Sequence, residues 1–254
     1  MRERLVFLHG FTQTHHHWHR GAHLIADRLG SEPTLAFVDL PGHGLSDADG
    51  TPIAGSGQSL ARVGGRGTWT GYSMGARFAL AAATSIDHSI DRLVLIGGTP
   101  GFIDEGERGQ RRTSDQQLAN RVVQVGVETF VDEWLAGPLF ADLPDDPQDR
   151  QHRLANTAAG LASSLRNAGT GVQPPMWDSL ARITIPVLVL AGARDAKFSE
   201  IGHRMVEALP NATFSTVDGA GHACHTEQPD RVADLIAAWI LQTPEAERLD
   251  RSVL

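Results

Sequence analysis

The sequence predicts an α/β fold in which helices flank a mostly parallel β-sheet. Short, almost continuously apolar runs recur along the chain and alternate with segments of helical periodicity. Continuous apolar runs are typical of strands covered on both faces. Their alternation with helices favours right-handed β-α-β connections. At 254 residues, the chain can form one large domain, or a domain with an insert.

Six segments are expected to be strands because they are apolar or rich in β-branched and aromatic residues. They are Leu5–Leu8, Leu35–Val38, Thr68–Thr70, Leu93–Ile96, Val187–Leu190 and Thr213–Val217. The last of these alternates more than the others, and Thr68–Thr70 is short. Each run would supply one strand of the sheet.

Helices are expected between these strands. Trp18–Leu29 places its apolar residues on one face, and residues 74–84 are rich in alanine. Gln58–Val63 carries a weak helical signal within the Gly- and Ala-rich segment Asp47–Arg66. A last helix follows Pro229, a residue favoured in the first turn, and its apolar stripe is spaced at helical intervals. The stripe consists of Val232, Leu235, Ile236, Trp239 and Ile240.

Residues 100–180 break the alternation because they contain no convincing strand. Helices are expected there over Val122–Trp134 and around Leu154–Leu165. The chain is therefore predicted to have a core of residues 1–99 and 181–243, with a helical lid insert at 100–180. The charged residues 244–254 are expected to form a C-terminal tail.

Composition excludes several other classes of protein. A net charge of −8 disfavours a nucleic-acid-binding surface, and no run of about 18 apolar residues predicts a membrane span. Only four apolar residues separate the charged N-terminus from His9, too few for a signal peptide. Cys224 is the single cysteine, which excludes an intramolecular disulfide and fits a reducing compartment. A cytoplasmic protein is expected.

A candidate nucleophile lies in Gly71-Tyr72-Ser73-Met74-Gly75, which matches Gly-x-Ser-x-Gly. A serine at a sharp turn from strand to helix has a crowded backbone, and flanking glycines relieve the crowding. The following helix N-terminus favours negative charge at the hydroxyl. A five-residue match can also be an ordinary glycine-flanked turn. The preceding β-like run and the following alanine-rich segment favour the catalytic interpretation.

A serine needs a base to become nucleophilic, and two partners follow in the required order. Asp195 comes shortly after the Val187–Leu190 run, and His222 comes after Thr213–Val217. Both would lie beyond the carboxyl ends of parallel strands, where ligands bind in open α/β sheets. His222 would accept the serine proton and Asp195 would orient the imidazole, although His225 is a competing base. The order of serine, acid and histidine predicts the α/β-hydrolase fold.

The turn after the first strand, His9-Gly10-Phe11, is expected to supply one half of an oxyanion hole. In this fold the backbone N–H groups of Phe11 and of Met74, which follows the nucleophile, would point at a developing negative charge. Such donors stabilise the charged transition state.

Two other patterns have competing interpretations. His15, His16, His17 and His19 surround Trp18, but no acidic or cysteine residue stands at a recognisable ligand spacing, so structural or pocket-rim roles are favoured over a metal site. The segment 97–101, Gly-Gly-Thr-Pro-Gly, lacks the Gly-Lys-Ser/Thr of a phosphate loop and is interpreted as the entry to the insert.

From Leu5 to about Trp239 the chain resembles the 2-succinyl-6-hydroxy-2,4-cyclohexadiene-1-carboxylate synthases of menaquinone biosynthesis. The segments that carry the resemblance include several found widely among α/β-hydrolases, such as Phe7–Phe11, Val38–Gly44 and Gly219–His222. More specific segments are Arg77 after the serine motif, Arg111–Asp115, Leu165–Asn167 and Asp195–Phe198.

The resemblance implies a lyase that eliminates pyruvate without a cofactor or metal. Its small-molecule substrate, 2-succinyl-5-enolpyruvyl-6-hydroxy-3-cyclohexene-1-carboxylate, carries three carboxylates. Arginine suits such a ligand because its planar guanidinium binds carboxylate bidentately. The resemblance implies that Arg77, Arg111, Arg166, Tyr72 and Trp134 contact this substrate.

Two other functions use the same residues. A carboxylesterase acting on a small acidic ester would need the same triad and oxyanion hole, and the arginine set favours the lyase over it. A ligand-binding protein without catalysis is disfavoured by the intact set of Ser73, Asp195 and His222. The sequence predicts no oligomeric state, so a monomer and a homo-oligomer both stay open.

Overall fold

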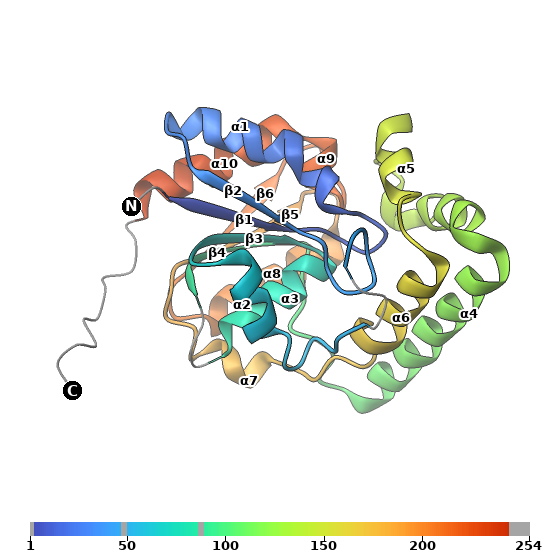
Figure 1. Ribbon diagram of the computed structural model, residues 1–254. Coiled ribbons are helices and arrows are strands. Elements are labelled where there is room, and N and C mark those ends of the chain that lie inside the picture. The colour runs from blue at the N-terminus through green and yellow to red at the C-terminus, as the bar shows by residue number, and fades with distance from the viewer. Residues whose placement is uncertain (1–2, 47–49, 86–88, 244–254) are drawn as a thin grey trace.

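Six parallel strands form one sheet in the order β2-β1-β3-β4-β5-β6 (Figure 1). The computed structural model describes residues 3–46, 50–85 and 89–243. The strands are β1 (Arg4–Leu8), β2 (Thr34–Val38), β3 (Gly67–Tyr72), β4 (Ile90–Ile96), β5 (Val187–Gly192) and β6 (Ala212–Val217). The prediction of a parallel sheet and all six predicted strand positions are confirmed. β3 is longer than the Thr68–Thr70 signal because Gly67, Gly71 and Tyr72 also pair with β4.

Helices cover both faces of the sheet because each strand alternates its side chains between two apolar layers. On β1, Leu5 and Phe7 pack in one hydrophobic cluster, whereas Val6 and Leu8 pack in the other. The first layer lies under α1 (His19–Leu29) and α10 (Pro229–Gln242), which contact each other closely. The second layer is covered by α2 (Gly57–Gly64), α3 (Met74–Ala83) and α8 (Ala196–Ala208).

Outside the insert, the helix predictions are confirmed with one shift at a boundary. Pro229 occupies the first turn of α10, as expected, and the weak Gln58–Val63 signal corresponds to α2. Trp18 belongs to a short 3-10 helix, η1 (His15–Trp18), which precedes α1. Its indole is fully buried and donates from Nε1 to the carbonyl oxygen of Leu8 at 3.1 Å, so tertiary packing fixes this turn.

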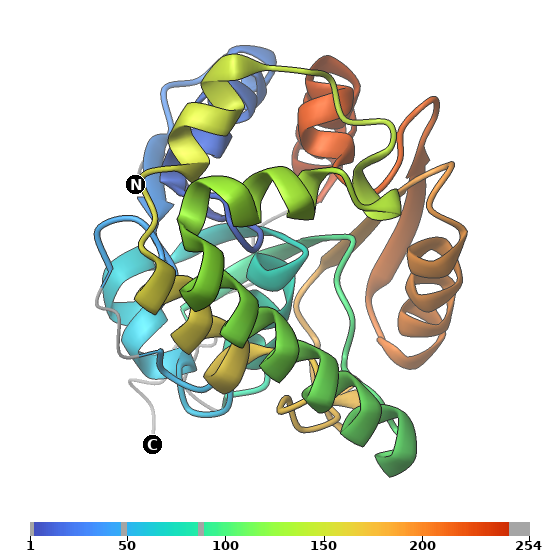
Figure 2. The same cartoon turned by 90° about the vertical axis from the view of Figure 1, so that its right-hand side faces the viewer.

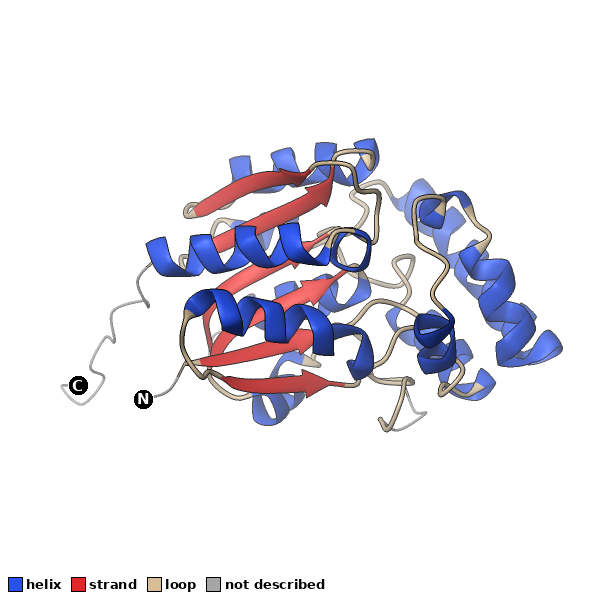
Figure 3. Cartoon of the chain, turned by 90° about the horizontal axis from the view of Figure 1, so that it is seen from above, coloured by secondary structure: helices blue, strands red, loops and turns tan. Residues whose placement is uncertain are grey.

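Residues 100–180, all of which the structure describes, contain helices and no strand. The helices are α4 (Glu105–Leu135), η2 (Pro138–Phe140), α5 (Pro147–Arg153), α6 (Ala158–Ala168) and α7 (Trp177–Leu180). α4 and α6 pack against each other beyond the carboxyl ends of the strands, on the right of Figure 1 and towards the viewer in Figure 2. Seen from above in Figure 3, the strand arrows point at this layer.

Two expectations for the insert were only partly right. The helix over Val122–Trp134 is the second half of α4, which bends at Gly126, where φ is 80°. The helix expected around Leu154–Leu165 is interrupted: α5 ends at Arg153 and α6 begins at Ala158. Asn156 causes the break because its side-chain amide donates to the carbonyl oxygens of Thr12 and Arg153, at 2.7 and 2.9 Å.

Three further observations bear on the sequence predictions. Cys224 is buried and free. No helix among the described residues has both the length and the apolar character needed to cross a membrane. The predicted tail, 244–254, and part of the segment Asp47–Arg66 lie outside the described residues.

Candidate active site

Ser73 stands at the junction of β3 and α3 in a strained backbone conformation. Its φ of 51° and ψ of −105° lie in a region that residues other than glycine rarely adopt. Its amide donates to the carbonyl oxygen of Ile96, at the end of β4, at 2.7 Å, which ties the turn to the sheet. A Cβ atom on Gly71 would lie 2.4 Å from the carbonyl oxygen of Gly75, and one on Gly75 would lie 2.2 Å from that of Leu8. Only glycine allows this turn to pack against β1.

The side chains of Ser73, His222 and Asp195 form a continuous hydrogen-bonded chain. Ser73 Oγ lies 3.1 Å from His222 Nε2, and His222 Nδ1 lies 2.7 Å from Asp195 Oδ2. Asp195 also accepts from the amide of Phe198 at 3.2 Å, which orients its carboxylate at the start of α8. The imidazole and the carboxylate are almost completely buried. With Nδ1–H donated to Asp195, the Nε2 lone pair of His222 faces the serine hydroxyl, as a general base requires.

His225, the competing base, points elsewhere. It is buried, its Nε2 lies 3.3 Å from the side-chain nitrogen of Gln13, and its ring packs at a tilt against Tyr72 with centroids 4.0 Å apart. The loop of His222 is fixed separately, because Glu227 accepts hydrogen bonds from the amides of Gly221 and Ala223 at 2.5 and 2.9 Å. The structure therefore brings His222, and not His225, to Ser73.

The loop that carries Phe11 is held by two buried histidines. His9 accepts from the amide of Leu40 at 3.0 Å, and His43 accepts from the amide of Thr12 at 3.3 Å. Phe11 and Met74 both line the cavity beside Ser73. The neighbouring residue Thr12 has a φ of 67°, which marks a tight turn. The oxyanion role of the two amides stays a prediction.

A cavity opens above Ser73 and His222. Its walls combine apolar groups from the insert, among them Trp134, Leu139 and Leu165, with hydroxyl and cationic groups. Three side chains on its wall carry a fixed positive charge: Arg77, Arg111 and Lys197. None of the described residues that line it is a carboxylate. The cavity therefore favours an anionic ligand.

Arg77 is the most buried of these cations, with 8% of its surface exposed. Its Nη1 donates to two neutral acceptors, the carbonyl oxygen of Ala168 at 2.8 Å and Gln173 Oε1 at 3.0 Å. Burial, and then the nearby charge of Arg111, lower the pKa of Arg77 to about 10, so the guanidinium stays protonated at neutral pH. No described carboxylate pairs with Arg77. An anionic ligand bound there would therefore compensate a buried positive charge that is otherwise unfavourable.

Arg111 is positioned by the insert itself. Its Nε donates to Asp115 Oδ1 at 2.7 Å, one helical turn further along α4. Asp115 is buried and its other oxygen accepts from the amide of Gly171 at 3.0 Å. This arrangement holds the guanidinium at the cavity wall, with about a third of its side chain exposed.

The structure separates the remaining predicted contact residues. Trp134 lines the cavity. Tyr72 does not: its ring is buried beneath Gly10, and its hydroxyl has no partner among the described residues. Arg166 is exposed on the outer face of α6 and donates to Asn120 Oδ1 at 3.1 Å. Neither side chain lines the cavity, and their contact with substrate stays a prediction.

Sequence reasoning had omitted Lys197 from the site. It stands two residues after Asp195, and it is the only lysine in a chain whose other basic residues are arginines. The helical stripe of α6 was also readable from the sequence. Leu161, Leu165 and Ala168 share the inward face, which turns Arg166 outward.

Comparisons with known proteins agree with this fold. A model of the Alpha/beta hydrolase family matches residues 5–235. The fold, the strained serine and its histidine and aspartate partners define the chain as a member of that family. A thermophilic esterase from Thermogutta terrifontis shares the fold, with 24% identity, a TM-score of 0.78, and coverage of 94% of this chain and 90% of that one.

Proteins that are more similar in sequence share a more specific name. The 2-succinyl-6-hydroxy-2,4-cyclohexadiene-1-carboxylate synthase of Salmonella typhimurium is 32% identical over 92% of this chain and 92% of its own. MenH from S. aureus is 32% identical with a TM-score of 0.85, over 94% of each chain. Within the Alpha/beta hydrolase family, the chain belongs with these 2-succinyl-6-hydroxy-2,4-cyclohexadiene-1-carboxylate synthases.

Proposed function

We propose that the protein eliminates pyruvate from 2-succinyl-5-enolpyruvyl-6-hydroxy-3-cyclohexene-1-carboxylate. The product would be 2-succinyl-6-hydroxy-2,4-cyclohexadiene-1-carboxylate, an intermediate of menaquinone biosynthesis. One observation carries this proposal beyond family membership. The cavity over Ser73 is lined by three cations and by no described carboxylate, which suits a substrate with three carboxylates.

The proposed reaction begins with loss of a proton from the ring carbon next to the succinyl ketone. The Ser73–His222 pair takes this proton, and the buried Asp195 stabilises the imidazolium that forms. The electron pair of the broken C–H bond moves through the ring as the enolate collapses. The ring carbon–oxygen bond to the enolpyruvyl group then breaks. Enolpyruvate leaves, takes up a proton and becomes pyruvate, so no cofactor or oxidant is involved.

The other groups of the site stabilise charge during this step. Developing negative charge on the ketone oxygen would be met by the amides of Phe11 and Met74, which replace water as donors. Arg77, Arg111 and Lys197 would hold carboxylates that are present before and after the reaction. When these carboxylates are held in place, the acidic C–H bond of the substrate is aligned with the base. Binding at groups that do not react thus orients the group that does.

In this proposal, residues 100–180 form a cap over the core made of residues 1–99 and 181–243. Trp134 and Leu139 from α4 and η2, and Leu165 from α6, line the same cavity as Ser73. A cap made of these residues would exclude water while the enolate exists. We place the activity in the cytoplasm, where the free thiol of buried Cys224 would persist. We expect neither nucleic acid nor membrane as a partner.

The test is an assay with the enolpyruvyl precursor, made freshly by the preceding enzyme. Pyruvate release and diene absorbance are followed together, with a simple aryl ester in parallel. Coupled appearance of both products, lost in Ser73→Ala and retained in Ser179→Ala, is expected. Ser179 lies on α7 and accepts from Arg182, away from the cavity. No acceleration over the spontaneous elimination, with rapid ester cleavage, would reassign the protein as a carboxylesterase.

A further inference from the structure

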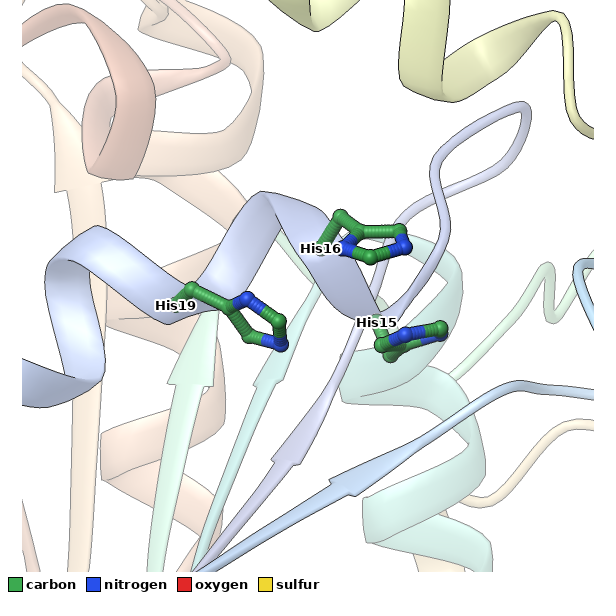
Figure 4. A group of neighbouring side chains, drawn as sticks. All are labelled: His15, His16 and His19. Atoms are coloured by element: carbon green, nitrogen blue, oxygen red, sulfur yellow. The ribbon is translucent and has the colours of Figure 1, made fainter.

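The histidine-rich run before α1 divides into an inner and an outer set. His17 and Trp18 point inward: the side chain of His17 is 2% exposed and that of Trp18 is buried. His15, His16 and His19 lie along the outer side of η1 and the first turn of α1 (Figure 4). Helical geometry places residues one turn apart on the same face, so the run gathers three imidazoles at the surface.

The three imidazoles are close enough to share one ion. One ring nitrogen from each of His15, His16 and His19 can be chosen so that all three lie within 4.8 Å of one another. Three nitrogens on a tetrahedral zinc ion, with bonds of about 2.1 Å, are separated by roughly 3.4 Å. The remaining gap of about 1.4 Å is within reach of small side-chain rotations. His16 is exposed and the other two are half-buried, so these rotations do not disturb the core.

Asp39 prepares His15 for this role. Its Oδ2 lies 2.8 Å from His15 Nδ1, and its Oδ1 accepts from the backbone amide of His15 at 2.8 Å. The Nδ1–H is thereby committed to the carboxylate, which leaves the lone pair of Nε2 free. A carboxylate behind a histidine is the arrangement that orients metal-binding imidazoles in proteins and raises their basicity.

The other two rings lie next to His15. The ring centroids of His15 and His16 are 4.0 Å apart, and those of His16 and His19 are 5.1 Å apart. His16 is further held by His152 of α5, on which it stacks with centroids 4.5 Å apart and an interplanar angle of 15°. His15 and His16 are therefore held near each other before an ion arrives, which reduces the entropy lost when small rotations complete the site.

We propose that His15, His16 and His19 form a binding site for one divalent transition-metal ion, of which Zn²⁺ is the representative. Three imidazoles select this class over Mg²⁺ and Ca²⁺, which prefer oxygen ligands. Three protein ligands leave the fourth tetrahedral position to water. None of the three histidines lines the cavity of Ser73, so the site is separate from the proposed reaction and does not depend on it.

The test uses the full chain without an affinity tag, stripped of metal by a chelator and titrated with Zn²⁺ against a chromophoric competitor. One Zn²⁺ per chain is expected, and His15→Ala, His16→Ala and His19→Ala are each expected to weaken binding at least tenfold. Loss of a residue that only hydrogen-bonds to a metal ligand already lowers metal affinity by about 10- to 100-fold. Loss of a ligand itself should therefore cost at least tenfold. His203→Ala is the matched control, since His203 is exposed on α8 and its ring packs at a tilt against Phe214.

A second measurement keeps the test independent of folding. Co²⁺ bound by three imidazoles and water would give visible absorption bands of a four-coordinate ion, and these should disappear in His19→Ala. Circular dichroism would show whether each variant is folded. The proposal is overturned if folded wild-type protein binds no stoichiometric Zn²⁺, or if His203→Ala weakens binding as much as His19→Ala. Ser73→Ala is expected to bind Zn²⁺ as tightly as the wild-type protein.

Discussion

The amide of Arg77 donates to the carbonyl oxygen of Ser73 at 3.2 Å, so the two residues are fixed one helical turn apart. The same turn that exposes the serine hydroxyl thus carries a buried guanidinium to the cavity wall. A substrate carboxylate on Arg77 would lie at a set position relative to Ser73. The first prediction tests this relationship.

Arg77→Ala should reduce kcat/KM for the enolpyruvyl substrate by at least about 30-fold, because truncating one partner of a buried charge pair costs about 2–5 kcal/mol. Arg77→Lys should recover only part of the loss, since an ammonium cannot make the bidentate contact. Steady-state kinetics measure both. Arg182→Ala is the control, as Arg182 is exposed and bonds to Ser179. Unchanged kinetics in Arg77→Ala would remove Arg77 from the site.

Arg166→Ala separates the family resemblance from the observed geometry. The resemblance implies a substrate contact, whereas the structure places Arg166 on the outside of α6, bonded to Asn120. From its position we expect less than about a threefold change in kcat/KM, as for an exposed charge worth about 0–1 kcal/mol. A loss as large as that in Arg77→Ala would show that α6 turns or shifts when substrate binds.

Gly75→Ala should destabilise the protein by about 1–3 kcal/mol, the usual cost of forcing atoms into a packed interior. The added Cβ would lie 2.2 Å from the backbone carbonyl oxygen of Leu8, which cannot rotate away. Urea unfolding gives the change in free energy. Gly109→Ala on α4 is the matched control, because its Cβ would meet nothing within 4 Å. There the change should be stabilising by about 0.5–1 kcal/mol. Equal effects at both positions would contradict the argument.

The free energy of unfolding should fall as the pH decreases from about 6.5 to 4. Burial lowers the pKa of His43 to about 4. Between this value and the pKa of about 6.5 in the unfolded chain, the unfolded state binds more protons, so acid favours unfolding. For His43 alone the full effect is about 3 kcal/mol, at about 1.4 kcal/mol for each pKa unit. Stability from this group is complete above pH 6.5.

Urea unfolding at several pH values measures this slope, and His43→Asn should flatten it. His43 accepts from the amide of Thr12, so protonation would also break the hydrogen bond that holds the Phe11 loop. His203→Asn, at an exposed position, should leave the slope unchanged. A slope in His43→Asn equal to that of the wild type would place the acid sensitivity elsewhere, for example at buried His9 or His225.

The strands, most helices and the order of Ser73, Asp195 and His222 could be predicted from sequence because each depends on local information. Apolar runs and helical stripes follow from the periodicity of the backbone, and Gly71 and Gly75 mark the turn that Ser73 requires. The interruption at Asn156 could not be predicted in this way. It results from a hydrogen bond to Thr12, which is 144 residues away in the chain.

The sequence by itself determined the layered sheet and the strained turn at Ser73. It also determined which histidines and arginines were candidate bases and substrate-binding cations. Only the tertiary structure decided which of them meet. It selected His222 over His225, placed the Arg77 guanidinium at the cavity wall, and gathered three surface histidines beside Asp39. The reason is geometric: the rotation of a helix and the meeting of strand ends depend on contacts between distant segments, which local periodicity does not encode.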